Sequence, residues 1–373
     1  MGDALGVIGG GQLGRYFVLA AQAMGYRVVV LEPDPQSPAG AVADEHIMAP
    51  YDDPDALAQL ANLCCAATVE FENPSVAALE LLERQIVVRP SSVAVAVAQD
   101  RRSEKRFCGE NGLAIAPFAI IEAPTDIAAA VERPLFPGII KTARLGYDGK
   151  GQRRIDHAEQ LADAFVALGS VPCVLELLVP LDAELSVVVA RGGDGEMAMF
   201  ATTHNVHING ILDSSTAPYA DDVIARKAQA IAVHIAERLN YVGVLGVEFF
   251  VSDSELLVNE IAPRPHNSGH WTLNAAQTSQ FEQQVHTLVG TPLGNSAMTH
   301  PAVAMVNLLG DRWQHGELQT DIARANPHAH LHLYGKSEAR PGRKMGHLTV
   351  VGNRAAEVLA AAHQLRDNIT VQS

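Results

Sequence analysis

The sequence predicts a mixed α/β and α+β protein with an amino-terminal doubly wound parallel-sheet domain, a central region of two lobes and a small β-rich carboxy-terminal domain. Three observations support this prediction. Short apolar runs alternate with helical periodicity at the start of the chain, which is typical of βαβ units. Short β runs and glycine-rich loops dominate the middle. A third set of β runs, followed by one helix, closes the chain.

Length and composition limit the possible classes of protein. The 373 residues allow two or three domains, because single cores stop growing near ~250–300 residues. We place the domains at residues 1–99, 100–292 and 293–373. A composition that is 48 % apolar and 18 % charged excludes disorder and fibrous repeats. The net charge of −15 disfavours a nucleic-acid partner, because binding a phosphate backbone needs a positive face.

The sequence also predicts a cytoplasmic location. No stretch reaches about 18 uninterrupted apolar residues, so we expect no membrane span. The first residues form a strand-and-turn pattern and lack the basic and apolar regions of a signal peptide. The four cysteines show neither metal-ligand nor disulfide spacing, which fits a reducing compartment.

The amino-terminal domain is predicted to alternate strands and helices along the chain. We expect strands at 5–9, 27–31, 66–71 and 86–88, helices at 14–25, 54–63 and 75–84, and a helical stretch over 92–111 that leads into the next region.

The central region is predicted to contain two helices among the short β runs of residues 117–169. Residues 173–261 follow with several β runs and one long helix at 221–239. In the carboxy-terminal domain, we expect strands at 303–308, 330–334 and 347–351 and a helix at 355–365.

The glycine-rich start is a weak nucleotide-binding signal. Gly9, Gly11 and Gly14 satisfy G-x-G-x-x-G between a strand and a helix, and Glu32 ends the next strand. This pattern indicates NAD, but nothing downstream supplies a second nucleotide-binding half or a hydride-transfer site. Alternatively, the glycines only make a tight turn. A third interpretation is that the helix start faces another anion or a sugar, with Gln12 at the tip of the turn.

Two carboxylates in the segment VGVLGVEFFVSDSELLVNEIAPRPHNSGHW carry the strongest chemical signal. Its two β runs, 242–251 and 255–261, predict a hairpin. If this hairpin centres on Ser254, Glu248 and Glu260 face each other, where like charges repel. A Mg²⁺ ion would relieve that repulsion and the cost of burying two acids in apolar runs. The alternative is that both acids lie on an exposed strand or pair with lysines.

Polar residues that follow the second carboxylate predict an anion site beside the metal. Asn259 precedes Glu260, and Arg264, His266 and Asn267 come soon after. The guanidinium of Arg264 can hold a carboxylate or phosphate through two parallel hydrogen bonds. His266 taken alone could instead be a structural histidine.

A lysine and a glycine-rich loop predict a phosphate-binding element. Lys141 ends a strand, and backbone N–H groups of a mobile glycine loop can close over phosphates. The loop lacks P-loop spacing, and an ordinary glycine-rich hairpin is the alternative. Its residues are Gly146, Tyr147, Asp148, Gly149, Lys150, Gly151 and Gln152.

A weaker signal follows the strand that begins at residue 173. Glu176, Leu177, Leu178 and Val179 could form an adenine-binding edge through their backbone groups. Glu184 would then accept hydrogen bonds from ribose hydroxyls.

Taken in order, the lysine strand, the glycine loop, the E-x-x-V segment and the paired glutamates resemble the ATP-grasp superfamily. Within it, the chain is most similar to the 5-(carboxyamino)imidazole ribonucleotide synthases of purine biosynthesis. The similarity spans essentially the whole chain, through GGGQLGR, EFEN, GYDGKGQ, THNVHINGIL, APRPHNSGHWT and RPGRKMGHL.

The resemblance implies an ATP-dependent carbon–nitrogen ligase that carboxylates aminoimidazole ribonucleotide with bicarbonate. ATP would be the co-substrate and Mg²⁺ the cofactor, held by Glu248 and Glu260, and the enzyme would be a homodimer. The implied ATP site consists of Arg101, Lys141, the loop 146–152, the segment 176–179, Glu184, His207, Asn259 and Glu260.

The resemblance also implies a ribonucleotide site against the amino-terminal turn. Gln12, Leu13, Glu70 and Asn267 would contact this substrate, although Glu72 is an open alternative to Glu70 at the ribose. Its phosphate would be neutralised by Lys336, Arg343 and Lys344.

We expect bicarbonate to attack the γ-phosphate of ATP, giving carboxyphosphate, which then carboxylates the amine directly or through carbon dioxide. Lys141 and Arg264 would neutralise charge in the first step. Asp148, with Tyr147 beside it, would orient or deprotonate the amine. His266 and Asn267 complete the predicted catalytic set.

Other functions remain open at this point. The nearer alternatives are a formate-dependent glycinamide ribonucleotide transformylase and a carboxylase acting on a biotinyl carrier. A non-catalytic or NAD-binding Rossmann protein is the more distant one.

Overall fold

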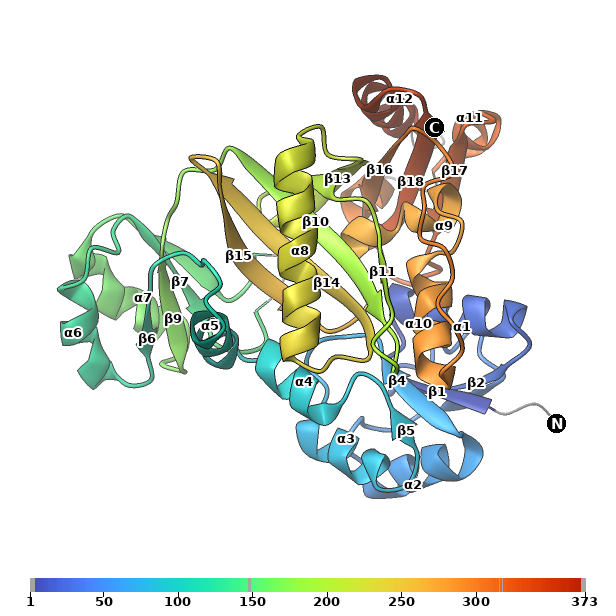
Figure 1. Cartoon of the computed structure of the whole chain (residues 1–373), viewed down its shortest axis with the longest axis horizontal. Coiled ribbons are helices and arrows are strands. Elements are labelled where there is room, and N and C mark those ends of the chain that lie inside the picture. The colour runs from blue at the N-terminus through green and yellow to red at the C-terminus, as the bar shows by residue number, and fades with distance from the viewer. Residues whose placement is uncertain (1–3, 147–148, 315, 317, 370–373) are drawn as a thin grey trace.

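The computed structural model describes residues 4–146, 149–314, 316 and 318–369, and its amino-terminal domain is built on a five-stranded parallel sheet (Figure 1). The strand order is β3-β2-β1-β4-β5, and every pair in it is parallel. The strands are β1 (Ala4–Ile8), β2 (Arg27–Leu31), β3 (Glu45–Ile47), β4 (Ala66–Val69) and β5 (Val87–Val88). The helices are α1 (Gln12–Ala23), α2 (Pro54–Leu63) and α3 (Val76–Glu83).

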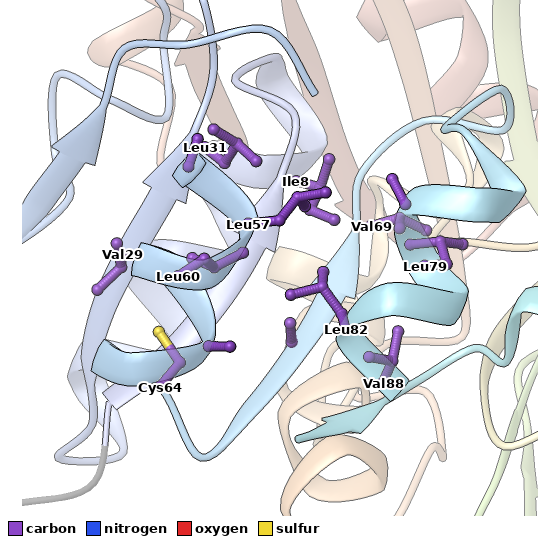
Figure 2. Packing of buried hydrophobic residues seen from close by; sticks show 14 of the residues in the cluster. Ile8, Val29, Leu31, Leu57, Leu60, Cys64, Val69, Leu79, Leu82 and Val88 are labelled. Carbon is purple, nitrogen blue, oxygen red and sulfur yellow. The ribbon is translucent and has the colours of Figure 1, made fainter. Parts of the chain in front are cut away.

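Apolar side chains hold this sheet between helices on both faces, which is why its central strands are continuously hydrophobic. Figure 2 shows Leu57 and Leu60 of α2 and Leu79 of α3 lying against Ile8 and Val69 of the sheet. Each of these side chains is almost fully buried, and such burial contributes roughly 1.5–3 kcal/mol. The opposite face packs on α1 and on a helix from the central region.

The helical stretch predicted over 92–111 is two helices, α4 (Ser92–Ala98) and α5 (Arg101–Glu110). The break comes at Asp100, whose extended backbone and side chain cap α5 by accepting from the Arg102 N–H. Helix α5 therefore starts on its own axis, with Arg101 as its first residue.

The smaller lobe of the central region is a four-stranded antiparallel sheet in the order β6-β9-β7-β8. Figure 1 shows short helices beside it, at the left of the view. The elements are β6 (Phe118–Ile121), α6 (Ile127–Val131), β7 (Gly138–Thr142), β8 (Gln152–Ile155), α7 (Leu161–Ala167) and β9 (Cys173–Leu177).

The second sheet has nine strands and joins the larger central lobe to the carboxy-terminal domain. Its order is β15-β14-β10-β12-β13-β16-β18-β17, with β11 paired to β10, so the strands after residue 293 extend the central sheet through the β13–β16 pair. The strands are β10 (Ala183–Arg191), β11 (Met197–Met199), β12 (Thr203–Ile208), β13 (Ile211–Ala217), β14 (Gly243–Ser252), β15 (Glu255–Ala262), β16 (Ala302–Leu309), β17 (Ala329–Leu333) and β18 (Lys344–Gly352).

Helices cover this sheet and connect it to the amino-terminal domain. Figure 1 shows α8 lying across β10, β14 and β15, and α10 lying beside α1. The helices are α8 (Asp222–Arg238), α9 (Thr272–Ala275), α10 (Gln280–Val289), α11 (Asp321–Arg324) and α12 (Ala355–Asn368). The predicted fold class is confirmed. Within the described ranges, no helix is both long and apolar enough to cross a lipid bilayer. The four cysteines form no disulfide.

Candidate active site

Glu248 and Glu260 are directly opposed across β14 and β15. The predicted centre of the hairpin was wrong, because the turn consists of Asp253 and Ser254, both with positive φ, and centres between them. If the strands kept the register set by this turn, Glu248 would lie opposite Asn259. A β-bulge leaves Asn259 unpaired and shifts the register by one residue, which brings the two glutamates opposite each other.

Each of the two glutamates is held by polar neighbours. Glu248 faces the Nε2 of His266 at 3.2 Å and accepts from Asn259 Nδ2 at 3.3 Å. Burial raises the pKa of Glu248, but His266, His207 and Asn259 together outweigh it and lower the pKa to about 2. Glu260 faces Arg101 at 3.4 Å. The alternative of exposed or lysine-paired acids is therefore wrong.

A buried ion-pair network lies behind the lysine of β7. The Lys141 Nζ donates to Glu176 at 2.8 Å, and Lys105 of α5 lies 3.3 Å from the other Glu176 oxygen. Burial raises the pKa of Glu176, but the two lysines outweigh it and lower the pKa to about 2. This network fixes Lys141, the last residue but one of β7.

Two of the backbone N–H groups in the predicted adenine-binding segment already form hydrogen bonds within the protein. The Leu177 and Leu178 N–H groups donate to the carbonyls of Pro117 and Pro137. Among the described residues, the segment 176–179 does not line the cavities of the site. An adenine edge here would depend on other backbone groups of the segment.

The first cavity, of about 350 Å³, holds most of the residues predicted for ATP and metal. Glu184 and His207 form a 2.6 Å pair at its wall. Ile139, Leu181 and Phe250 give it an apolar portion. The predicted residues along its lining are Arg101, Lys141, Gly149, Lys150, Gln152, Glu184, His207, Glu248, Asn259, Glu260, Arg264, His266, Asn267 and Lys344.

The second cavity, of about 800 Å³, contains all seven residues predicted to bind the ribonucleotide. They come from four distant parts of the chain and meet where α1 begins. These residues are Gln12, Leu13, Glu70, Asn267, Lys336, Arg343 and Lys344. The Gln12 Nε2 donates to the Asn267 Oδ1 at 3.2 Å, which ties the amino-terminal turn to the segment after β15.

The two cavities share a wall made of Glu72, Lys150, Arg264, Asn267 and Lys344. At this wall, the Arg264 Nε donates to the Glu72 Oε2 at 2.6 Å. Burial lowers the pKa of Arg264, but Glu72, Glu260 and Glu70 together outweigh it and raise the pKa. The two cavities are therefore adjacent, with Arg264 in the wall between them.

The amino-terminal turn does not leave room for a dinucleotide. The Glu70 carboxylate accepts from the N–H groups of Gly11 and Gly14 at 3.0 and 3.2 Å, at the helix start where a pyrophosphate would bind. Glu32 is buried and accepts from the N–H groups of Gly10 and Asp34 and from the Tyr51 hydroxyl, so it is not available to a ribose. A Cβ at Gly11 would lie 2.6 Å from Glu70, and the glycine there admits this carboxylate.

Some predicted residues lie apart from the two cavities. Gly146 lines a small adjoining cavity together with Glu72 and Arg101. Gly151, at φ 69°, closes the loop on Thr142. Tyr147 and Asp148 lie outside the described residues.

Sequence reasoning missed several residues of the site. Tyr51 and Arg340 line the larger cavity, and Arg340 was within reach because it opens the RPGRKMGHL motif. Phe250 lies two residues after Glu248 on the same face of β14, a strand spacing that could have found it. Lys105 stands one helical turn after Arg101, but its partner Glu176 is distant in sequence.

Comparisons with known proteins agree with this arrangement. Family models match in succession: a ribonucleotide synthetase preATP-grasp domain at 2–99, an ATP-grasp domain at 106–281 and a phosphoribosylaminoimidazole carboxylase C-terminal domain at 303–361. The N5-carboxyaminoimidazole ribonucleotide synthase of Brucella melitensis is 44 % identical over 357 residues, which cover 95 % of this chain and 97 % of the relative.

Two solved structures show the same similarity in three dimensions. N5-carboxyaminoimidazole synthetase from Staphylococcus aureus, complexed with ADP, has a TM-score of 0.91 at 38 % identity, covering 98 % of this chain and 97 % of that one. N5-carboxyaminoimidazole synthase from Aspergillus clavatus, in complex with ADP and 5-aminoimidazole ribonucleotide, has a TM-score of 0.89 at 30 % identity, covering 99 % of both chains.

The fold and the paired cavities define an ATP-grasp enzyme, an ATP-dependent ligase. The chain belongs to the N5-carboxyaminoimidazole ribonucleotide synthase family of purine biosynthesis, as the sequence motifs predicted. A formate-dependent transformylase is not favoured.

Proposed function

We propose that this chain carboxylates the amine of 5-aminoimidazole ribonucleotide with bicarbonate, converting ATP to ADP and phosphate. The observation that carries this proposal is the shared wall of the two cavities, where Arg264 lies between the predicted nucleotide and ribonucleotide sites. A phosphorylated intermediate made in one cavity could react in the other without crossing solvent, which protects it from hydrolysis.

The smaller cavity fits a nucleoside triphosphate. Its apolar residues Ile139, Leu181 and Phe250 suit a base, and the Glu184–His207 pair suits ribose hydroxyls. Lys141, held by Glu176, offers a fixed positive charge to the phosphates.

The larger cavity fits a ribonucleotide monophosphate. Arg340, Arg343, Lys336 and Lys344 all line it, in an otherwise acidic protein. These cations suit a 5′-phosphate, because arginine and lysine bind phosphate oxygens through charge-assisted hydrogen bonds. Glu70 also lines the cavity, where its carboxylate can accept hydrogen bonds from ribose hydroxyls.

Glu248 and Glu260 fit a magnesium ion, because two opposed carboxylates border the cavity that would contain the phosphates. No cluster of three or more His, Cys, Asp or Glu suited to a metal occurs among the described residues. Magnesium needs only one or two carboxylates when substrate phosphates complete its shell. Bound there, the ion would neutralise charge on the transferring phosphate.

In the first step, a bicarbonate oxygen forms a bond to the γ-phosphorus and the bond to the ADP oxygen breaks, giving carboxyphosphate. Lys141 and Arg264 neutralise the charge that develops, which is the main protein contribution to phosphoryl transfer. Asn267, which lines both cavities, orients the bicarbonate, and His266 supports the first step through its contact with Glu248.

In the second step, the substrate amine forms a bond to the carboxyl carbon, directly or after carbon dioxide forms, and phosphate leaves. Asp148 with Tyr147 remains our predicted group for orienting or deprotonating the amine. Homodimer assembly and a cytoplasmic location likewise remain predictions.

Phosphate release tests this function. The enzyme is supplied with ATP, Mg²⁺, bicarbonate and 5-aminoimidazole ribonucleotide, and each is then omitted in turn. We expect full turnover only with all four. Turnover that persists when formate replaces bicarbonate and glycinamide ribonucleotide replaces the imidazole substrate would overturn the proposal.

A further inference from the structure

A chain of buried polar side chains runs through the nine-stranded sheet and ends at His266. The Ser215 hydroxyl on β13 donates to Asn205 Oδ1 at 2.8 Å, and Asn205 Nδ2 donates to Ser186 Oγ on β10 at 2.9 Å. Ser186 Oγ lies 2.7 Å from Ser268 Oγ, which lies 2.7 Å from His266 Nδ1. All five side chains are at least nine-tenths buried.

The register of the sheet brings these residues together. Asn205 and Ser215 are directly opposed across β12 and β13, and Ser186 is directly opposed to Glu248 across β10 and β14. His266 lies over Gly246 of β14, where a Cβ would come within 2.8 Å of the His266 Cβ. The last member of the chain is thereby pressed against the strand that carries Glu248.

The direction of these hydrogen bonds follows from the amide at Asn205. Because the amide nitrogen donates to Ser186 Oγ, the Ser186 hydroxyl is free to donate onward to Ser268. The Ser268 hydroxyl then has its own hydrogen to donate to His266 Nδ1, and in this arrangement Nδ1 accepts and carries no hydrogen.

The backbone N–H of Ser268 independently indicates that His266 Nδ1 is an acceptor. The Ser268 N–H points at His266 Nδ1, 3.4 Å away, and a backbone N–H can only donate. Turning the Asn205 amide around would reverse the side-chain bonds and place a hydrogen on Nδ1, facing that N–H. Of the two donors to Nδ1, the Ser268 hydroxyl at 2.7 Å is the closer, and the N–H at 3.4 Å only favours this direction over the reversed one. The neutral ring therefore carries its hydrogen on Nε2, which faces Glu248 Oε1 at 3.2 Å.

We propose that Asn205, Ser186 and Ser268 are positioning residues that hold neutral His266 as the Nε2–H tautomer, so that it donates to Glu248 and fixes that carboxylate in the nucleotide cavity. His266 therefore acts through Nε2 as a hydrogen-bond donor, not as a base. The tautomer follows from the geometry alone, and only its effect on catalysis rests on the proposed function.

Nitrogen-15 NMR of the histidine rings measures the tautomer directly, because protonated and unprotonated ring nitrogens have well-separated shifts. The His266 signals are identified by subtracting the spectrum of a His266→Gln sample. We expect a protonated Nε2 and an unprotonated Nδ1 at neutral pH in the unliganded wild-type enzyme. An unprotonated Nε2 with a protonated Nδ1 would overturn the inference before any further variant is made.

The variant Ser268→Ala removes the hydroxyl that donates to Nδ1. We expect a mixture of the two tautomers and a roughly 10-fold or larger increase in the Mg²⁺ concentration for half-maximal ATP turnover, as is typical when a group orienting a metal ligand is lost. KM for the ribonucleotide should change little. The matched control is Ser214→Ala, which removes an equally buried hydroxyl from β13 outside this chain.

The outcomes separate the two proposals. A Ser268→Ala enzyme that keeps the wild-type tautomer and Mg²⁺ dependence contradicts the positioning role. Should the variant fold poorly, Ser186→Ala interrupts the chain one link earlier, and the same loss of tautomer preference is expected. If the tautomer is as inferred but the enzyme does not consume bicarbonate, the proposed function fails while this inference stands.

Discussion

Glu72 accepts a 2.6 Å hydrogen bond from the Nε of Arg264 across 192 residues of sequence, and this pair stands in the wall between the two cavities. Glu72 belongs to the segment after β4 of the amino-terminal domain, and Arg264 follows β15. A second donor of Arg264 bonds the Pro265 carbonyl. The guanidinium therefore has a fixed orientation at the place where the two substrates would meet.

The variant Glu72→Gln keeps the shape of this side chain and removes its charge. We expect unfolding free energy to fall by about 1–3 kcal/mol, less than for a fully enclosed pair because Glu72 borders a cavity. We also expect kcat to fall at least ~10-fold, since Arg264 loses its alignment. Urea unfolding and phosphate release measure the two effects. Glu122→Gln, at an exposed ion pair, is the control and should change neither. An unaltered kcat in Glu72→Gln would contradict the claim that Glu72 aligns Arg264 for catalysis.

The metal assignment predicts the effect of Glu260→Gln. Losing one of two opposed carboxylates should raise the Mg²⁺ concentration for half-maximal turnover by at least ~10-fold and lower kcat. Titration of ATP turnover with Mg²⁺ provides the measurement. The exposed Glu255, on the same strand, supplies the control Glu255→Gln. Near-normal turnover in Glu260→Gln at limiting Mg²⁺ would show that this carboxylate does not hold the ion.

The phosphate assignment predicts a selective loss of ribonucleotide affinity. In the double variant Lys336→Ala, Arg343→Ala, we expect KM for aminoimidazole ribonucleotide to rise by about 10²-fold or more, because each charge-assisted contact contributes roughly 1.5–3 kcal/mol. KM for ATP should change less than ~3-fold, since neither residue lines the smaller cavity as described. Steady-state kinetics with each substrate varied decides the matter. Equal losses for both substrates would contradict the assignment.

The two buried lysines beside Glu176 predict that the protein loses folding stability in acid. The folded-state pKa of about 2 lies below the ordinary value of 4.5, so the native carboxylate holds its charge more strongly than the unfolded one. This stabilisation, about 3 kcal/mol, is complete above the ordinary pKa and is lost as pH falls through about 2. Glu176→Gln should therefore be destabilised by roughly 3–5 kcal/mol at neutral pH, where Lys141 and Lys105 lose their counter-charge.

Urea unfolding between pH 7 and pH 2 checks this prediction. The difference in unfolding free energy between wild type and Glu176→Gln should shrink as the pH falls below about 4.5. A difference that is independent of pH would indicate lost packing, with no contribution from the charge.

The sequence could predict the sheet strands and the opposed glutamates because these depend on local pattern. Strand β2 has the predicted bounds, and Glu248 meets Glu260 as expected. The β-bulge that brings the two glutamates opposite each other could not be predicted, because Asn259 carries no strong local signal for it. The break at Asp100 had a signal, a helix-capping residue, that the apolar periodicity of its surroundings obscured.

Long-range partners were beyond the sequence. Arg101 reaches Glu260 across 159 residues, and nothing local to either residue indicates the other. The glycine fingerprint is a case in which a local pattern indicated the wrong ligand. Its spacing fits a pyrophosphate turn, but the anion at the helix start is the carboxylate of Glu70, which only the tertiary fold brings there.

A crystal structure of the enzyme with a non-hydrolysable ATP analogue, Mg²⁺ and aminoimidazole ribonucleotide tests most directly whether one continuous site joins the two substrates. We predict an ion between the triphosphate and the carboxylates of Glu248 and Glu260, the ribonucleotide phosphate beside Lys336 and Arg343, and the guanidinium of Arg264 between the ligands. A nucleotide bound at the amino-terminal turn, or a metal held away from both glutamates, would contradict this account.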